Sequence, residues 1–462
     1  MVLSDLAYEP KKVIKSGFTY LLKEAKASKN NKLGIYYMIF RRFLQISVFL
    51  SVLGTSGYAI AQDAPLAPEP TTGIQQKQEV SASDFMAVTA HPDATKAAYD
   101  ILKQGGTAAD AAIAAQMVLG LVEPQSSGIG GGAFLLYYDN KHKQLFTLDG
   151  RETAPSTAGE HLFTGADGKP MGFYEAALGG RSVGTPGVLK LLSKLYDWQG
   201  KTDWVTLFQP AIQLAEKGFT VSERLNKMLA EEQPRFEKDV KAKIFFFPDT
   251  VNPIEAGSVK RNPEYAISLR QIAQEGPTVF YGGKVGKDIV EHVQKFKGSL
   301  SIEDITAYQA KERKAVCDGY RGYKVCSMGE PSSGGLTLLM ILGMLENFDL
   351  PSWGPNNPTS WHVINEASRL AFADRNKYMA DADKVETPNE LLLNSDYLNQ
   401  RSKLIDINKP MLSVSAGLPP AWIDVEQGSD PRTKNSGTGA RAAKRKSLAP
   451  VGRCRLGARW RC

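Results

Sequence analysis

Apolar and polar residues recur with two different periods in this chain, and the change of period marks where helices give way to strands. Apolar positions follow helical spacing from Asp93 to about Gln104, and again in "TAADAAIAAQMVLGLV" from Thr107. Asp93 is expected to cap the first helix, the Gly-Gly pair after it to end it, and Thr107 to open the second. After the glycine cluster of residues 128–132, the period becomes two in "AFLLYYDNKHKQLFTLDGRE", which predicts a β-hairpin around a polar turn.

Helical patterns dominate the rest of the chain. A turn at residues 184–187 precedes "VLKLLSKLYDW", and further helical stretches lie near residues 204–232 and 262–296. A serine-capped helix is expected at "SIEDITAY", and the pattern continues in "GGLTLLMILGMLENF" and "PTSWHVINEASRLAFADRNKYM". Strands among many helices, without a repeated βαβ period, predict a layered α/β or α+β body.

The formal net charge of +7 resides at the two ends of the chain rather than in its body. Residues 1–62 carry nine Lys or Arg against three acids, and residues 429–462 carry ten against one. Residues 63–428 between them are therefore acidic, with a formal charge of −8. Because proteins that bind nucleic acid present a basic surface, this distribution argues against a nucleic-acid partner.

The N-terminal part of the chain is typical of a targeting sequence rather than of a folded domain. Residues 38–61 have a basic start, an apolar run and a small-residue cleavage site, which together predict a signal peptide. A membrane anchor is the alternative, although the apolar run is short for a membrane span. Residues 1–37 precede a good start methionine and are interpreted as a non-native extension, and the Pro-, Gln- and Ala-rich residues 62–84 as a disordered linker. We therefore expect a periplasmic or secreted protein with no stable membrane span.

Cys317 and Cys326 flank "DGYRGYKV", in which a glycine-containing turn lies between two β-rich arms. The two thiols can face each other across a hairpin, and in an oxidising compartment this arrangement predicts a disulfide. Two unpaired thiols are the alternative, because cross-strand disulfide geometry is demanding.

Motifs of several enzyme classes are missing from the chain. The five histidines form neither HExxH nor an i,i+4 pair. The glycine cluster 128–132 is not followed by Gly-Lys-Ser or Gly-Lys-Thr, so it does not match a phosphate-binding loop. The sequence therefore predicts no metal site and no cofactor, and the glycine cluster is interpreted as a structural turn.

Arg151 is the candidate for substrate binding. It ends the second hairpin arm in "LDGRETAP", and the small residues and proline that follow predict a position facing a cleft. A guanidinium group there can hold a carboxylate through two parallel hydrogen bonds. The alternative is a surface ion pair with Asp149 or Glu152.

An ordered set of motifs resembles the gamma-glutamyltranspeptidase family and spans roughly residues 85–410. Besides the alanine-rich pattern after residue 88, the set comprises "GIGGGAFLLYY", "LDGRETAP", "GTPG", "GPTVFYGG", "AYQAKER", "YRGYKVCSMGEPSSGGL" and "AFADRNKY". The resemblance identifies residues 85–428 as the large-subunit part of a glutathione hydrolase proenzyme. It implies a layered α+β fold, the α-β-β-α sandwich of the N-terminal-nucleophile hydrolases. It also implies that Arg151 binds the α-carboxylate of a γ-glutamyl group, and that the glycine cluster and alanine helices build the walls of the site.

The family's chemistry depends on a threonine that begins a separate small subunit. The precursor cleaves its own chain at this threonine, whose freed α-amine then serves as the base for its hydroxyl. The threonine attacks the γ-glutamyl carbonyl of glutathione or another γ-glutamyl compound, and water or an amino acid resolves the acyl-enzyme. The resemblance thus implies two partners for this chain: γ-glutamyl compounds and a small subunit.

The family's threonine motif does not appear where the resemblance places it, shortly after residue 425. Thr-x-His occurs only at residues 89–91, and Thr433 and Thr438 begin no strand-like pattern. We therefore assign no catalytic residue and expect the chain to be inactive by itself. Residues 429–462 are interpreted as an aberrant basic tail produced by a reading-frame slip, with a genuine basic tail for acidic surfaces as the alternative.

Two other functions stay open. One is a related acylase that acts on β-lactam side chains and dispenses with the arginine contact. The other is a non-catalytic secreted remnant that binds glutathione or a partner chain.

Overall fold

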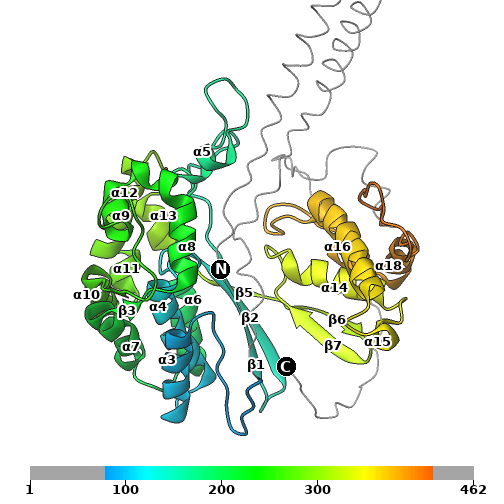
Figure 1. Cartoon of the computed structure of the whole chain (residues 1–462), viewed down its shortest axis with the longest axis horizontal. Helices are drawn as coiled ribbons and strands as arrows, with labels where there is room; N and C mark the ends of the chain where they lie inside the picture. The colour runs from blue at the N-terminus through cyan, green and yellow to red at the C-terminus, as the bar shows by residue number, and fades with distance from the viewer. Residues whose placement is uncertain (1–78, 420–462) are drawn as a thin grey trace, which may run out of the picture. The chain divides into compact units, whose positions relative to one another are not determined.

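The computed structural model describes residues 79–419, in which helices are interspersed with short antiparallel strands (Figure 1). These residues contain a three-stranded sheet in the order β1-β2-β5 and two two-stranded sheets, β3-β4 and β6-β7. The predicted extension 1–37, signal peptide 38–61 and tail 429–462 lie outside the described residues, as does most of the predicted linker 62–84. The strands are β1 (Ala133–Asp139), β2 (Gln144–Gly150), β3 (Phe219–Thr220), β4 (Val259–Lys260), β5 (Lys311–Arg313), β6 (Val316–Tyr320) and β7 (Tyr323–Ser327). The helices are α3 (Pro92–Lys103), α4 (Ala108–Val122), α5 (Phe173–Ala177), α6 (Val188–Gln199), α7 (Trp204–Lys217), α8 (Glu223–Glu232), the 3₁₀ helix η1 (Gln233–Lys238), α9 (Val240–Phe246), α10 (Pro263–Glu275), α11 (Thr278–Tyr281), α12 (Lys284–Lys295), α13 (Ile302–Ala307), α14 (Gly334–Leu345), α15 (Leu350–Trp353), α16 (Pro358–Tyr378), α17 (Asn389–Leu392) and α18 (Ser395–Ser402).

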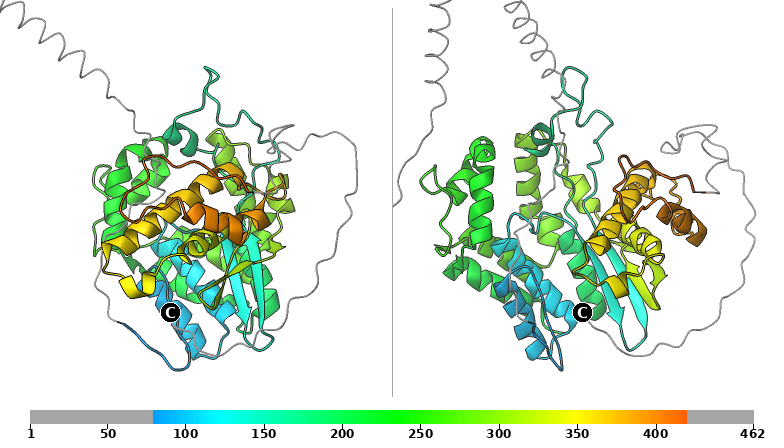
Figure 2. Two further views of the ribbon diagram at one scale, coloured as in Figure 1. Left: turned by 90° about the vertical axis from the view of Figure 1, so that its right-hand side faces the viewer. Right: turned by 45° about the vertical axis from the view of Figure 1, so that its right-hand side comes forward.

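The larger of two hydrophobic cores gathers around the alanine-rich helices. Helix α4 contacts α3, α6 and α7, and its buried residues lie on several sides of it rather than along one stripe. Ala109, Ala114 and Ala115 are at most 6% exposed, and their single methyl groups allow the neighbouring backbones to approach closely. Figure 2 shows α3 and α4 in blue and the strands of the hairpin in cyan. Helix α6 contacts α4 as well as β1 and β2, so the alanine-rich helices support the sheet through α6.

The start of α3 differs from the prediction, whereas the start of α4 agrees with it. The N-cap of α3 is His91, whose Nδ1 accepts a hydrogen bond from the Asp93 amide (3.2 Å), so the prediction of Asp93 as the cap was wrong. The physical reason is Pro92, whose fixed φ and missing N–H suit the first helical position. Thr107 caps α4 as expected, in a reciprocal capping box with Asp110.

The predicted hairpin is confirmed as strands β1 and β2, which pair antiparallel from Ala133 opposite Gly150 to Asp139 opposite Gln144. Alternate β1 side chains, including Leu135, pack on the larger core, whereas Leu136 on the opposite face is 41% exposed. The sequence did not predict β5, which pairs with the end of β2. Its residues, "KER", are all polar and too few to show a period.

A second core joins α14, α16 and α18 to the hairpin of β6 and β7. Cys317 and Cys326 are directly opposed in this hairpin, and their sulfur atoms are bonded in the structure (S–S 2.16 Å). The turn between the strands is formed by Arg321 and Gly322, both with positive φ, as a tight hairpin requires.

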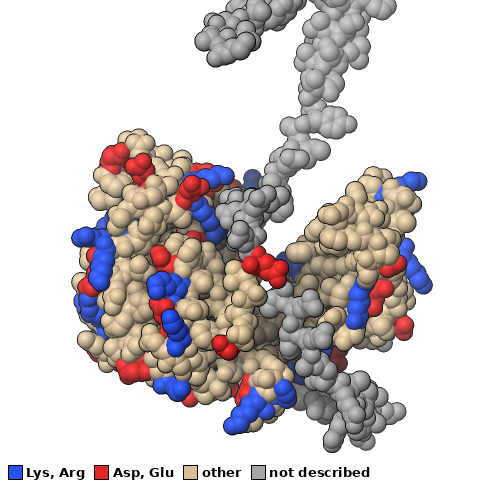
Figure 3. Space-filling model, turned by 60° about the horizontal axis from the view of Figure 1, so that its bottom comes forward, with Lys and Arg blue, Asp and Glu red and all other residues tan. Residues whose placement is uncertain are grey.

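Charged side chains of both signs are interspersed on the molecular face drawn in Figure 3, rather than gathered into one basic patch. None of the helices in residues 79–419 is both long and apolar enough to cross a lipid bilayer.

Candidate substrate-binding site

Three segments meet at the end of the hairpin where β1 begins and β2 ends. The glycine cluster 128–132 leads into β1, residues 151–153 follow β2, and the turn 184–187 leads into α6. The amides of Gly187 and Val188 donate hydrogen bonds to the Gly131 carbonyl (2.9 and 3.1 Å). The Thr185 amide likewise donates to the Thr153 carbonyl (2.8 Å). The motifs "GIGGG", "LDGRETAP" and "GTPG" therefore form one site.

Close backbone approach explains several of the glycines in this site. A Cβ on Gly187 would overlap the Gly150 carbonyl oxygen, and a Cβ on Gly132 would lie 2.8 Å from the same oxygen. By contrast, a Cβ on Gly128 would meet nothing within 4 Å. Part of the glycine cluster thus serves packing, in agreement with its interpretation as a structural turn.

Buried side chains hold the backbone of Arg151 on both sides. Its amide donates to Asp149 Oδ1 (2.9 Å), and its carbonyl accepts a hydrogen bond from the Tyr308 hydroxyl (2.7 Å). Asp149 and Tyr308 are each 5% exposed. Burial raises the pKa of Tyr308 well above its usual value, and the charges of Asp149 and Glu152 raise it further, so the phenol remains a donor. The described residues therefore hold the backbone of Arg151 in place by themselves.

Asp149 is in turn held by a charged network. Arg313 Nε lies 3.0 Å from Asp149 Oδ2, while Nη1 and Nη2 of the same guanidinium lie 2.6 and 2.8 Å from the two Asp383 oxygens. Lys311 Nζ also contacts Asp383, at 2.6 Å. Hydrogen bonds from Arg313 and then from Lys311 lower the pKa of Asp383 far below its usual value, and the pKa of Arg313 is raised, mainly by Asp383. The network connects β2 and β5 to the loop that follows α16.

The side chain of Arg151 is 62% exposed, and its Nε lies 3.5 Å from Glu152 Oε2. This contact is the ion pair with Glu152 that the sequence offers as the alternative to carboxylate binding. An exposed pair of this kind contributes only about 0–1 kcal/mol, so a substrate carboxylate can replace it at little cost. Neither Nη group has a hydrogen-bond partner among residues 79–419, and the planar end of the guanidinium is open to a ligand.

Sequence reasoning missed Tyr308, Arg313 and Asp383 as members of the site. Tyr308 and Arg313 lie in the motif "AYQAKER", which contributed to the family resemblance but carried no role of its own. No local pattern marks Asp383, because its importance depends on a contact with Arg313 across 70 positions of sequence.

The described part of the chain shows no assembled nucleophile. The Thr89 hydroxyl donates to the His91 carbonyl (2.8 Å) while His91 caps α3, so this Thr-x-His sequence is a capping structure. Thr185 pairs with Thr153, two residues after Arg151, but it is 1% exposed and its hydroxyl has no described hydrogen-bond partner. Within residues 79–419, no group of three or more His, Cys, Asp or Glu residues is arranged to hold a metal ion.

Comparisons of the sequence and of the structure with known proteins agree on one family. A sequence profile described as gamma-glutamyltranspeptidase matches residues 94–439. The glutathione hydrolase proenzyme of Bacillus subtilis (strain 168) is 34% identical over 374 residues, which are 81% of this chain and 63% of that protein. The crystal structure of Helicobacter pylori gamma-glutamyltranspeptidase aligns with a TM-score of 0.70 at 33% identity, covering 74% of this chain and 97% of that one. Cephalosporin acylase from Bacillus halodurans aligns with a TM-score of 0.65 at 28% identity, covering 77% and 65%. These matches confirm the predicted α+β, N-terminal-nucleophile hydrolase class, and the chain spans just under two thirds of the curated relative.

Proposed function

The chain belongs to the gamma-glutamyltranspeptidase family, and from this premise we propose that it supplies the substrate-binding part of an enzyme. The proposed enzyme transfers the γ-glutamyl group of glutathione and related compounds to water or amino acids. The observation that carries the proposal is the geometry of Arg151. Its backbone is held by Asp149 and Tyr308, and both its Nη groups are open among the described residues. A guanidinium fork of this kind matches the α-carboxylate of a γ-glutamyl substrate.

In the proposed reaction, Arg151 holds the substrate carboxylate while a threonine hydroxyl attacks the γ-carbonyl carbon. The α-amine of that threonine accepts the hydroxyl proton and then protonates the leaving amine as the amide bond breaks. Water or an amino acid next attacks the ester, which releases the γ-glutamyl group and restores the hydroxyl. The described residues contribute binding and orientation to these steps rather than the bond-forming atoms.

The threonine is proposed to come from a small subunit that this sequence does not contain. The exposed Leu136 on the β1 face opposite the core supports this, because a layered sandwich would cover that face. A reading-frame slip near Ser429 is the proposed origin of the basic tail, although the family match continues to residue 439. Sequencing the gene through this position tests the slip, and a next frame without a Thr-x-His-like strand would contradict it.

Export to the periplasm or the cell exterior is proposed from the signal-like residues 38–61. The disulfide between Cys317 and Cys326 supports an oxidising location.

Turnover of a γ-glutamyl anilide tests the proposed function. The chain alone should show no turnover, and addition of a separately produced small subunit should restore it. In the restored enzyme, Arg151→Ala should raise KM about 10- to 100-fold, the loss expected for charge-assisted hydrogen bonds. Arg270→Ala is the matched control, because Arg270 is 41% exposed and also pairs with a neighbouring glutamate. Turnover by the chain alone, or an unchanged KM for Arg151→Ala, would contradict the proposal.

A β-lactam side-chain acylase is the second candidate, and the structural match to cephalosporin acylase favours it. The restored enzyme would then cleave a cephalosporin side chain faster than the γ-glutamyl anilide. A non-catalytic glutathione-binding remnant would bind glutathione in a calorimetric titration but would gain no turnover when the small subunit is added, which distinguishes it from both enzymes.

A further inference from the structure

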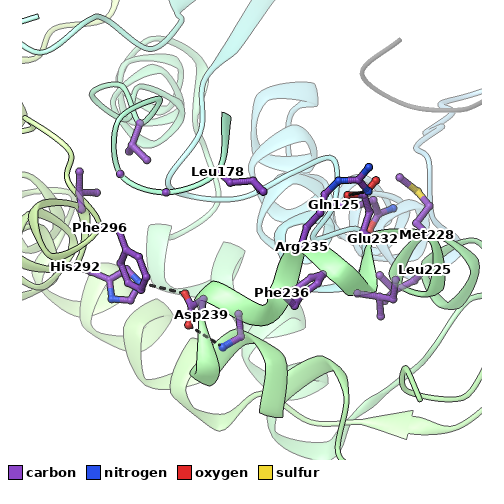
Figure 4. Close-up of a pocket in the computed structure, with 16 residues that line it drawn as sticks. Gln125, Leu178, Leu225, Met228, Glu232, Arg235, Phe236, Asp239, His292 and Phe296 are labelled. Carbon is purple, nitrogen blue, oxygen red and sulfur yellow. Dashed lines mark hydrogen bonds and ion pairs between the residues drawn. The ribbon is translucent and has the colours of Figure 1, made fainter. Parts of the chain in front are cut away.

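Two further features of the described residues stand apart from the proposed substrate site. One is a cavity of about 410 Å³ between the loop that precedes α6 and the helices α8, η1, α9 and α12 (Figure 4). Both of its acidic side chains already have partners. Glu232 Oε2 lies 2.6 Å from Arg235 Nη1. Asp239 Oδ2 lies 3.3 Å from His292 Nε2, so the cavity offers no free charge that would select a ligand.

The other feature is the segment of residues 411–418, which follows α18 and belongs to no helix or strand. Side chains of α16 hold its first residue. The Met411 amide donates to Glu366 Oε2, and the Met411 carbonyl accepts from Arg369 Nη1, at 2.8 Å each. Glu366 is 3% exposed, and Val414 packs on the second core. The start of the segment is therefore fixed, although its backbone is irregular.

A buried ion pair holds the end of the same segment. Asp374 on α16 is 0% exposed and Arg401 on α18 is 6% exposed, and Arg401 Nη2 lies 3.1 Å from Asp374 Oδ1. Asp374 Oδ1 also accepts the Gly417 amide (2.7 Å), and Arg401 Nη2 donates to the Ser415 carbonyl (2.9 Å). The Tyr378 hydroxyl donates to the Gly417 carbonyl (2.5 Å). Both ions of the pair therefore contact the backbone of the segment.

Only glycine fits at position 417. A Cβ on Gly417 would overlap the Tyr397 hydroxyl and would lie 2.9 Å from Arg401 Cδ. The Tyr397 hydroxyl cannot move aside easily, because this residue is 2% exposed and donates to Asp374 Oδ2 (2.9 Å). The buried cluster therefore accepts the segment in one register.

The stability of the fold alone does not account for this cluster. Taking two charges out of water is unfavourable, and apolar residues of similar volume often stabilise a core as well or better. Buried ion pairs have a clearer use where they fix one register among several. The register that Asp374 and Arg401 fix is that of the 411–418 segment against α16 and α18.

We propose that the cluster of Asp374, Arg401 and Tyr378 positions the chain for self-cleavage of a precursor, by fixing the point from which the chain leads to the proposed threonine. The inference rests on the proposed function, in which the threonine motif lies shortly after residue 425. Eight positions separate Gly417 from residue 425. An extended chain of that length spans at most about 28 Å. A fixed Gly417 therefore limits the volume that the threonine can occupy, and this favours a productive geometry.

The cleaved bond is the peptide bond before the threonine. The threonine hydroxyl attacks the carbonyl carbon of the preceding residue, the C–N bond breaks, and the hydroxyl proton passes to the freed amine. Water then hydrolyses the resulting ester, which restores the hydroxyl and leaves a carboxylate on the preceding residue and a proton in the solvent. The cluster contributes no atom to these steps and acts through position alone.

Hydrogen exchange in the purified chain, followed by mass spectrometry with electron-transfer fragmentation, tests the anchoring. The Met411 and Gly417 amides, which donate to buried carboxylates, should exchange at least about 10-fold more slowly than those of Leu412 and Ser413. Gly417→Ala should remove this protection while leaving the buried ion pair in place. Ser413→Ala is the matched control, because Ser413 is exposed, and it should keep the protection. Full protection in Gly417→Ala would overturn the proposal.

Self-cleavage of the chain continued in the corrected reading frame tests the positioning. The rate at which two fragments accumulate should fall at least about 10-fold in Gly417→Ala. Tyr378→Phe keeps the ring and removes the hydrogen bond to the Gly417 carbonyl, so it should slow cleavage about 2- to 10-fold. Ser413→Ala should cleave at the parent rate.

Ile113→Val separates positioning from stability. Ile113 is 0% exposed in the other core, so this variant should lower the urea midpoint and leave the cleavage rate unchanged. Equal rates in Gly417→Ala and the parent, or an equal slowing by Ile113→Val, would overturn the inference alone. A parent chain that does not cleave itself would overturn both the inference and the proposed threonine chemistry.

Discussion

Replacing Tyr308 with phenylalanine tests whether one buried phenol holds the backbone of Arg151. The substitution removes only the hydroxyl that donates to the Arg151 carbonyl at 2.7 Å, while the ring stays packed at 5% exposure. No large cavity forms, so the cost is the lost hydrogen bond and the carbonyl left without a donor. Together these amount to about 1–2 kcal/mol of the free energy of unfolding.

Urea unfolding at neutral pH measures this effect. With an m-value of about 3 kcal/mol/M for a chain of this size, a loss of 1–2 kcal/mol lowers the midpoint by about 0.3–0.7 M. Tyr323→Phe is the matched control, because Tyr323 is 71% exposed, and its midpoint should not move. A Tyr308→Phe midpoint equal to that of the control would refute the reasoning. In the enzyme restored with a small subunit, Tyr308→Phe should also raise KM more than it lowers kcat, as expected for a residue that positions Arg151.

Two further predictions concern the charged network and the disulfide. The pKa of Asp383 is lowered by Arg313 and Lys311, so this pairing stabilises the fold above the usual aspartate pKa of about 4 and is lost as the pH falls below it. Asp383→Asn should therefore cost up to about 1 kcal/mol at neutral pH, with the difference from the parent chain shrinking below about pH 4 in urea titrations. Reduction of the Cys317–Cys326 bond, which closes a loop with a sequence separation of 9, should cost about 2.5 kcal/mol on the chain-entropy estimate. The double variant Cys317→Ala and Cys326→Ala should unfold at the same urea midpoint with and without dithiothreitol, and a reductant-sensitive midpoint in that variant would contradict the assignment.

Long helices and hairpins were predictable because their signals are local. The capping box of Thr107 and the alternation in β1 each lie within a few residues of sequence. The errors also have local causes: Pro92 moved the first cap to His91, and the three polar residues of β5 carry no period.

The candidate site was predictable only in part, for a physical reason. Arg151 follows a strand that the alternation predicts, so its place at the end of the hairpin could be inferred. Tyr308 and Arg313 reach this site across sequence separations of 157 and 164 residues. Contacts of that range depend on the tertiary fold, and no periodicity in a single sequence reports them.

The contacts that hold Arg151 lead us to expect that the proposed carboxylate binding and the proposed bond cleavage are separable. Asp149 and Tyr308 fix its backbone from within the described residues, and Arg313 fixes Asp149. None of these contacts requires the segment that would carry the proposed threonine. The carboxylate-binding geometry should therefore form in the chain by itself, whereas catalysis should depend on what the small subunit adds. Substitutions at Tyr308 or Asp149 should therefore alter carboxylate binding by the chain itself. Addition of the threonine should add catalysis without altering this binding.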